Sequence, residues 1–143
     1  MGKNAGNAIS SGDVNNVLIG ENAGLSINAG EANAIIGFSA GDALTSGDLN
    51  TAIGYFALST STDVDRVVAI GTEAMEAGNV TSAADGTVAI GSKALQVLTS
   101  GAANVAIGKD SGKALTTGAH NTFLGTTTGD DMVEGSYNIA IGS

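Results

Sequence analysis

The chain has 143 residues, a formal net charge of -9 at neutral pH and no cysteine. This length suffices for one domain with a continuous core. The acidic balance argues against nucleic-acid binding, which requires a basic surface. The lack of cysteine excludes a disulfide framework, a thiol nucleophile and a zinc-thiolate site. The sequence contains no run of about 18 apolar residues, so it predicts no membrane span.

A two-residue signature, isoleucine followed by glycine, recurs along the whole chain, with methionine or leucine replacing isoleucine in two copies. The steps between its glycines are 17 residues long, except for one of 18 and one of 20. These glycines are Gly2, Gly20, Gly37, Gly54, Gly71, Gly91, Gly108, Gly125 and Gly142. Such a regular period predicts a repeat architecture.

A repeat of 17 residues is too short for a helical hairpin or a propeller blade, and it suits one coil of a parallel β-solenoid. We therefore predict an all-β solenoid of about eight coils, forming one domain over residues 1–143 with irregular coils at 53–89. Each coil should supply two short strands, one through the Ile-Gly signature and one near the Leu-Thr-Ser segment. A helix-dominated fold is the alternative, but 22 glycines interrupt most stretches long enough for a helix.

Two further positions recur in most coils. A glycine eleven residues after the isoleucine predicts a corner with positive φ. These glycines are Gly12, Gly30, Gly47, Gly101, Gly118 and Gly135. An asparagine three residues before the next isoleucine is expected to hydrogen bond along a stacked column. These asparagines are Asn16, Asn33, Asn50, Asn104, Asn121 and Asn138.

Both faces of the signature strand are apolar. Because side chains alternate along a strand, we assign the isoleucine face to the core of each coil. The predicted core residues are Ile19, Ile36, Ile53, Ile70, Ile90, Ile107, Leu124 and Ile141. The opposite face is apolar in every copy, and strands apolar on both faces are buried on both faces, so we assign it to an oligomer interface. The predicted interface residues are Leu18, Ile35, Ala52, Ala69, Ala89, Ala106, Phe123 and Ala140. A threefold bundle agrees with this pattern and a dimer is the alternative.

Residues 104–108 read Asn-Val-Ala-Ile-Gly, and residues 138–142 read Asn-Ile-Ala-Ile-Gly. This signature resembles the head repeats of trimeric autotransporter adhesins, and the longer units resemble repeats of bacteriophage tail fibres and other virion appendages. The resemblance implies a left-handed parallel β-roll assembled as a homotrimer. It also implies that valine and isoleucine fill each chain's core while the intervening alanine faces the threefold axis. The coils are longer than in a typical adhesin head, and nothing matches that family's stalk or membrane anchor.

Two regions are candidates for surface binding. The coil at 70–89 is three residues longer than its neighbours, so the segment 73–86 is a candidate lateral binding loop, with an inert surface bulge as the alternative. Phe38 and Tyr55 hold the same position in adjacent coils, and Phe56 follows. These three aromatic residues suit stacking on a sugar ring or a receptor surface. A packing ladder between coils is the alternative.

Acidic residues recur at one corner of the coils, at Asp13, Glu31, Asp48 and Asp65, and predict a solvated edge. A calcium site is the alternative interpretation, from Asp63 with Asp65 or from Asp130 with Asp131. Neither pair matches a known calcium repeat, and we expect no metal or other cofactor. The single histidine, His120, has no cysteine or placed carboxylate beside it, so we expect no enzyme activity.

These observations favour a structural and adhesive rod from a virion fibre or similar appendage, such as a phage tail or head fibre, that contacts a host surface. The expected location is the virion. The alternatives are the head domain of a bacterial trimeric autotransporter adhesin, on the cell surface, and a carbohydrate- or ice-binding solenoid. Expected partners are further copies of the chain, other appendage proteins at the ends, and a host glycan or protein; nucleic acid and membrane are not expected.

Overall fold

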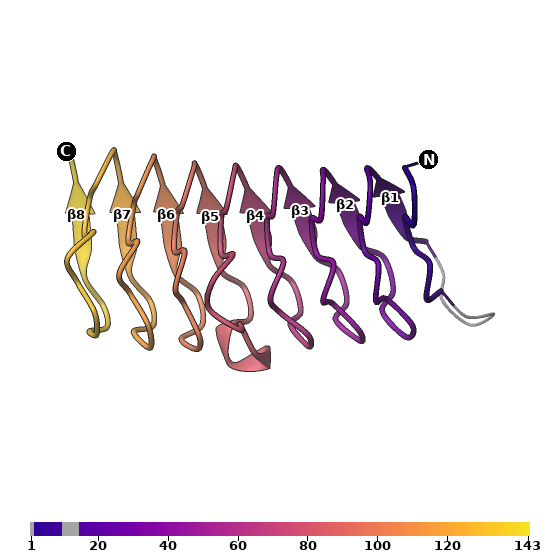
Figure 1. Cartoon of the computed structure of the whole chain (residues 1–143). Helices are drawn as coiled ribbons and strands as arrows, with labels where there is room; N and C mark the ends of the chain where they lie inside the picture. Colours follow the sequence, from indigo (N-terminus) through magenta and orange to yellow (C-terminus); the bar gives the residue numbers. More distant parts are fainter. Residues whose placement is uncertain (1, 10–14) are drawn as a thin grey trace.

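The computed structural model describes residues 2–9 and 15–143. Its strands form one parallel sheet in sequence order (Figure 1). The strands are β1 (Val17–Ile19), β2 (Ala34–Ile36), β3 (Thr51–Ile53), β4 (Val68–Ile70), β5 (Val88–Ile90), β6 (Val105–Ile107), β7 (Thr122–Leu124) and β8 (Ile139–Ile141). Eight strands with about 17-residue spacing make a parallel β-solenoid of about 7 turns. This confirms the predicted fold class.

The described part of the chain has one strand per coil, so the prediction of two is wrong. Near the Leu-Thr-Ser segment the carbonyl of Thr62 accepts hydrogen bonds from both Thr45 N (2.9 Å) and Ser46 N (3.4 Å). One carbonyl with two donors breaks the regular donor and acceptor alternation of a ladder. In the described part of this region, strand pairing is limited to one isolated parallel bridge, between Asp63 and Thr81. The one helical element described is a short 3-10 turn, η1 (Ser82–Ala84).

The Ile-Gly signature has a steric cause. Gly54 has a φ of 137° and follows β3 directly. A Cβ on it would lie 2.5 Å from the carbonyl oxygen of Gly71 in the next coil. The stacked glycines at this corner therefore satisfy two requirements at once, a backbone conformation that disfavours a side chain and a close approach between coils.

The second glycine corner works differently from our prediction. Positive φ occurs at Gly101 (107°) and Gly135 (136°). A close approach occurs instead at Gly30, Gly47 and Gly118, where a Cβ would lie 2.5, 2.2 and 1.8 Å from a carbonyl oxygen of the next coil. At these three corners glycine is needed for space and not for φ. Gly12 and the corner acid Asp13 lie outside the described residues.

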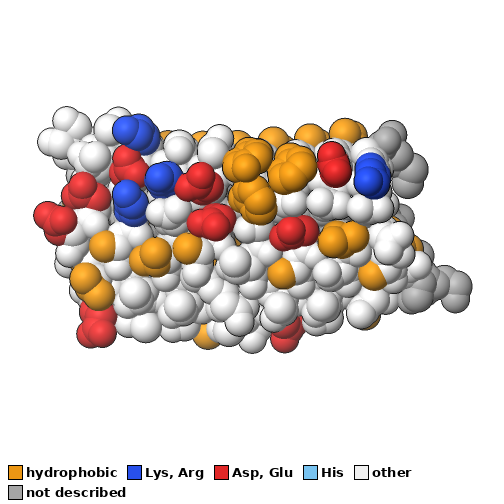
Figure 2. Space-filling view, in the orientation of Figure 1, with side chains coloured by type: hydrophobic (Ala, Val, Ile, Leu, Met, Phe, Trp, Pro, Cys, Tyr) orange, Lys and Arg blue, Asp and Glu red, His pale blue; other side chains and the backbone are white. Residues whose placement is uncertain are grey.

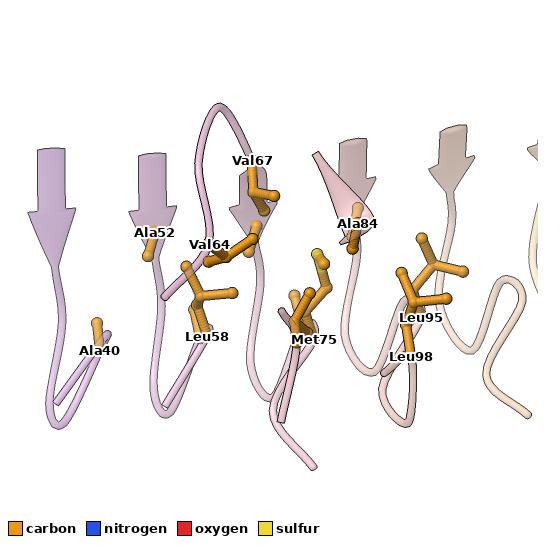
Figure 3. Close-up of a cluster of buried hydrophobic side chains, with 14 of the residues drawn as sticks. Ala40, Ala52, Leu58, Val64, Val67, Met75, Ala84, Leu95 and Leu98 are labelled. Atoms are coloured by element: carbon orange, nitrogen blue, oxygen red, sulfur yellow. The ribbon is translucent and has the colours of Figure 1, made fainter. Parts of the chain in front are cut away.

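The core lies between the strands and the segments that return along the other wall of the coil. The residue at the centre of each strand points inward. Ile35, Ala52, Ala69, Ala89, Ala106 and Phe123 are fully buried, Leu18 is buried, and Ala140 packs partly buried against the same core. Figure 3 shows Ala40, Leu58, Met75 and Leu95 from the other wall, together with Ala52, all within this interior.

The predicted assignment of the two strand faces is therefore wrong. The isoleucine positions assigned to the core lie on the outer surface: Ile19, Leu124 and Ile141 are exposed, and Ile36, Ile53, Ile70, Ile90 and Ile107 are half-buried. The positions assigned to an oligomer interface fill the interior of the single chain. A strand of three residues flanked by corners sends one side chain inward, its central one, and the two flanking side chains outward.

Volume matching across the core explains which residues occupy the strand centres. Where the centre is large, the residue six positions later is glycine, as at Ile35 with Gly41. A Cβ on Gly41 would lie 3.3 Å from Ile35 Cδ1. At the alanine centres of β3, β4 and β5 the residue six later is large: Leu58 for Ala52, Met75 for Ala69 and Leu95 for Ala89, all buried. Ala106 is the exception, because the residue six later is Gly112; a Cβ there would lie 2.8 Å from side-chain atoms of Leu95 and Phe123 in the neighbouring coils. Close packing thus keeps the coil cross-section constant.

The predicted asparagine column is confirmed. Asn33 Oδ1 accepts a hydrogen bond from Asn50 N at 2.9 Å, and Asn33 Nδ2 donates to Gly47 O at 2.8 Å. The pattern is interrupted where Val67 and Thr87 replace asparagine, although Val67 N still donates to Asn50 Oδ1 at 3.0 Å. Because these amides are buried, each one ties two neighbouring coils together away from water.

Candidate functional site

The outer surface of the sheet carries a regular apolar strip along the rod. We call it the sheet face; it consists of the first and last residue of each strand. Its members are Val17, Ala34, Thr51, Val68, Val88, Val105, Thr122 and Ile139 in one column and Ile19, Ile36, Ile53, Ile70, Ile90, Ile107, Leu124 and Ile141 in the other. All are apolar except Thr51 and Thr122, and none is charged. Eight strands about 4.8 Å apart and a width of about 10 Å give roughly 400 Å².

An area of this size is typical of the largest apolar patch on a soluble monomer, and such a patch is often functional. The side chains at its ends are strongly exposed, at 49% for Val17, 52% for Ile19 and 71% for Ile141. In the middle of the sheet the β-branched side chains shield one another within each column and are half-buried. The sheet face therefore has the apolar composition and length of an interaction surface.

A second exposed apolar group lies beyond the Ile-Gly corner, and we call it the aromatic cluster: Phe38, Tyr55 and Phe56. The rings of Phe38 and Tyr55 stack with centroids 5.5 Å apart and an interplanar angle of 15°. Phe56 meets both edge-on, at 5.7 Å from Phe38 and 4.6 Å from Tyr55. Phe38 is 41% exposed and Tyr55 51%. The rings form the packing ladder expected as one alternative, and they also leave apolar surface open to solvent.

Carboxylates border the aromatic cluster. Figure 2 shows hydrophobic side chains grouped on this face of the rod with acidic side chains around them. Glu21 precedes Phe38 by one coil in the same column, and Glu73 follows Phe56 in the next column. Glu73 forms an ion pair with Lys93 Nζ at 3.6 Å and accepts a hydrogen bond from Gln96 Nε2 at 3.2 Å. Burial raises the pKa of Asp42, although hydrogen bonds from Ser39 and from backbone amides oppose the shift.

The segment 73–86 forms a bulge at one edge of the rod, as predicted from its extra length (Figure 1). It contains η1, and Arg66 of the preceding coil pairs with Asp85 at its end. The hydrogen bond and charge of Asp85 raise the pKa of Arg66. Because this ion pair is exposed, it adds little stability. Whether the loop binds a partner stays a prediction.

Comparison with protein-family models, with characterised proteins and with solved structures found no match. The fold is compatible with β-roll repeats. No helix within residues 2–9 and 15–143 is long and apolar enough to cross a membrane.

The acidic corner has a structural role that the sequence analysis missed. Asp65 Oδ1 accepts a hydrogen bond from Asp48 N at 2.8 Å, and Asp48 Oδ1 accepts one from Glu31 N at 2.8 Å. Each carboxylate thus caps the backbone of the preceding coil. The signal was present in the sequence, because the acids occupy equivalent positions one repeat apart.

The residues considered for metal binding and catalysis do not converge. In the described ranges, no three His, Asp or Glu side chains are grouped closely enough to hold a metal ion. Asp63 Oδ1 accepts from Ser46 Oγ at 3.2 Å. His120 stacks on Tyr137 with centroids 5.0 Å apart and an interplanar angle of 8°. Asp130 and Asp131 line a shallow, open depression together with Lys113.

Proposed function

We propose that this chain is a structural and adhesive rod of a virion fibre or similar appendage, and that it assembles as a homotrimer through the sheet face. The observation that carries the proposal is the uncharged strip of valine and isoleucine along the rod. Burying apolar area is the dominant favourable contribution to most protein association. A surface with the same period as the rod is matched best by another surface with that period, which is a second copy of the chain.

The sheet face alone is too small for a stable pair of chains, so the proposed threefold assembly has to bury further surface beside it. Two strips packed face to face would bury about 800 Å² in total, less than the roughly 1,200 Å² at the lower limit of stable interfaces. Three strips around an axis bury each strip and also bring the flanking corners of neighbouring rods together. A closed threefold arrangement would thereby cover all the exposed isoleucines.

The internal bonding suits a rod that stays extended. Every coil is joined to the next by strand pairing and by corner hydrogen bonds such as Gly54 N to Ile36 O (2.8 Å). Along the asparagine column, buried side chains add further links. Each coil contacts its neighbours in sequence, so stiffness accumulates along the axis. Such a rod would hold a contact surface away from the particle that carries it.

The test is the native mass in solution, measured by sedimentation or light scattering. Ile107→Lys places a charge within the sheet face, on β6, and should lower the mass from three chains to one. Thr117→Lys is the matched control, because Thr117 is exposed and lies outside the sheet face. It should leave the mass unchanged. A monomeric wild-type chain, or an Ile107→Lys variant that stays trimeric, would overturn the proposal; a dimer would retain the interface and overturn the threefold packing.

The second candidate is the head of a bacterial trimeric autotransporter adhesin, favoured by the Asn-Val-Ala-Ile-Gly motif at 104–108. It would use the same sheet face, and the full reading frame distinguishes it by a stalk and a membrane anchor. An ice-binding solenoid is less well supported. The hydroxyls of Thr45, Thr99 and Thr116 each donate to a carbonyl of the next coil, at 2.8, 3.0 and 2.9 Å. Threonines bonded in this way are less available to order water.

A further inference from the structure

We propose that the aromatic cluster and Glu21 form a binding site for a cationic side chain, arginine in preference to lysine, on a partner polypeptide. The inference deepens the proposed adhesive function by stating the chemistry of the partner. The biological role of the site rests on the proposed adhesive function. The binding itself does not depend on assembly, because the site contains no residue of the sheet face.

The first step is the position of the rings. Phe38 stacks on Tyr55 through one of its faces, at 5.5 Å. The opposite face of Phe38 is turned along the rod toward the preceding coil, where Glu21 occupies the equivalent position. Hydrogen bonds fix this register: Ser39 N donates to Glu21 O at 2.9 Å, and Phe56 N donates to Phe38 O at 3.0 Å. Glu21 and Phe38 are therefore neighbours about 4.8 Å apart along the axis.

The second step is the charge of Glu21. Among the described residues its carboxylate forms no ion pair, whereas Glu73 at the other end of the cluster is matched by Lys93. The whole chain carries 14 acidic residues against 5 lysine and arginine residues. Lys3 holds the equivalent position one coil before Glu21, where Asn22 N donates to Lys3 O at 2.9 Å, but the two side chains form no ion pair. The end of the cluster formed by Phe38 and Glu21 therefore combines exposed aromatic surface with a carboxylate that has no ion-pair partner among the described residues.

The third step is the ligand chemistry. A cation above an aromatic face is attracted by the ring quadrupole, and a carboxylate beside the ring adds a charge-assisted hydrogen bond. Guanidinium is planar, so it can extend the ring stack and pair with a carboxylate at its edge, whereas ammonium is a compact and strongly hydrated charge. Anionic ligands would be repelled. A neutral sugar would gain from the rings but not from the charge of Glu21.

The chain provides its own optical probe for a binding test. It has no tryptophan and two tyrosines, Tyr55 and Tyr137. In a Tyr137→Phe background, tyrosine emission reports Tyr55 alone. The ligand is the peptide Gly-Arg-Gly-Arg-Gly, which has no aromatic residue. Titration should change the emission in a saturable way. The lysine peptide should bind several-fold more weakly, and the glutamate peptide and maltotriose should have no effect.

Variants separate the site from general attraction to an acidic protein. Glu21→Gln and Phe38→Leu should each weaken binding of the arginine peptide several-fold. Glu134→Gln removes the same charge from an exposed position several coils away, and it should leave binding unchanged. Equal weakening by Glu134→Gln would show unspecific charge attraction and overturn the proposal. Saturable binding of maltotriose in place of the peptide, or no binding at all, would overturn it as well.

This test can fail independently of the assembly test. A monomeric chain that still binds the arginine peptide through Glu21 and Phe38 would overturn the proposed rod and leave this site standing. A trimer that does not bind the arginine peptide would overturn this site and leave the proposed rod standing.

Discussion

At the scale of single residues, this fold depends on positions where a side chain has no room. The corner glycines of the Ile-Gly signature lie against the backbone of the next coil, and their φ values lie near 135°, as at Gly37 (138°) and Gly91 (133°). Three larger residues also have positive φ, which is unfavourable for a side chain: Leu58, Met75 and Leu95, with values between 48° and 56°. Their buried side chains offset this strain by filling the core.

We expect Gly54→Ala to destabilise the protein by about 3 kcal/mol or more, because it adds steric overlap with Gly71 to an unfavourable φ. The measurement is urea unfolding followed by circular dichroism. Gly86→Ala is the control: Gly86 also has positive φ (71°), but a Cβ there would meet nothing within 4 Å. It should cost about 1 kcal/mol. Equal losses in the two variants would contradict the close approach between coils.

At the scale of elements, the strand and the returning wall of each coil are matched by volume. A large strand centre meets glycine, as for Phe123 and Gly129, and the alanine centres of β3, β4 and β5 meet leucine or methionine. The strand alone does not reveal this arrangement, because both of its faces are apolar. Because Ala52 and Leu58 are matched in volume, substitutions at these two positions test whether the side chain of residue 52 points into the core.

Leu58→Gly should destabilise the protein by about 2 to 4 kcal/mol, because the cavity it creates outweighs the relief of a positive φ. The double variant Ala52→Ile with Leu58→Gly reproduces the pairing of Ile35 with Gly41 and should recover about half of that loss. Urea unfolding of the two variants and the wild type measures both values. A double variant less stable than Leu58→Gly would place residue 52 outside the core and contradict the correction made to the strand faces.

At the scale of the whole molecule, two surfaces differ in their physical character. The sheet face has no ionisable side chain, whereas the aromatic cluster is bordered by carboxylates. Salt screens charges but does not weaken apolar association. The two proposed interactions should therefore respond differently to ionic strength.

The mass of the assembly should be the same at about 50 mM and about 500 mM NaCl, while the affinity for the arginine peptide should fall several-fold over that range. Sedimentation at both salt concentrations and the tyrosine titration provide the comparison. Dissociation of the assembly at high salt would indicate that charged corners, and not the valine and isoleucine strip, hold the copies together.

Much of the fold could be predicted because the repeat is regular. The Ile-Gly period located all eight strands, and the asparagines identified a column of buried hydrogen bonds. The second strand was predicted in error because the carbonyl of Thr62 accepts from two backbone amides, Thr45 N and Ser46 N, an arrangement that the sequence pattern does not reveal. The aromatic residues were found from their spacing, and Glu21 lies at the same spacing, one repeat before Phe38. Its proposed role was missed because the search was restricted to aromatic residues.

The sequence by itself determined the solenoid, its spacing and the apolar character of both strand faces, since these follow from periodicity and from the requirements of glycine corners. Only the tertiary structure decided which face is inside. Alternation along a strand separates two faces but does not distinguish them when both are apolar. The inward face is set by the volume available between the two walls, and that volume depends on residues six positions away, such as Leu58 opposite Ala52.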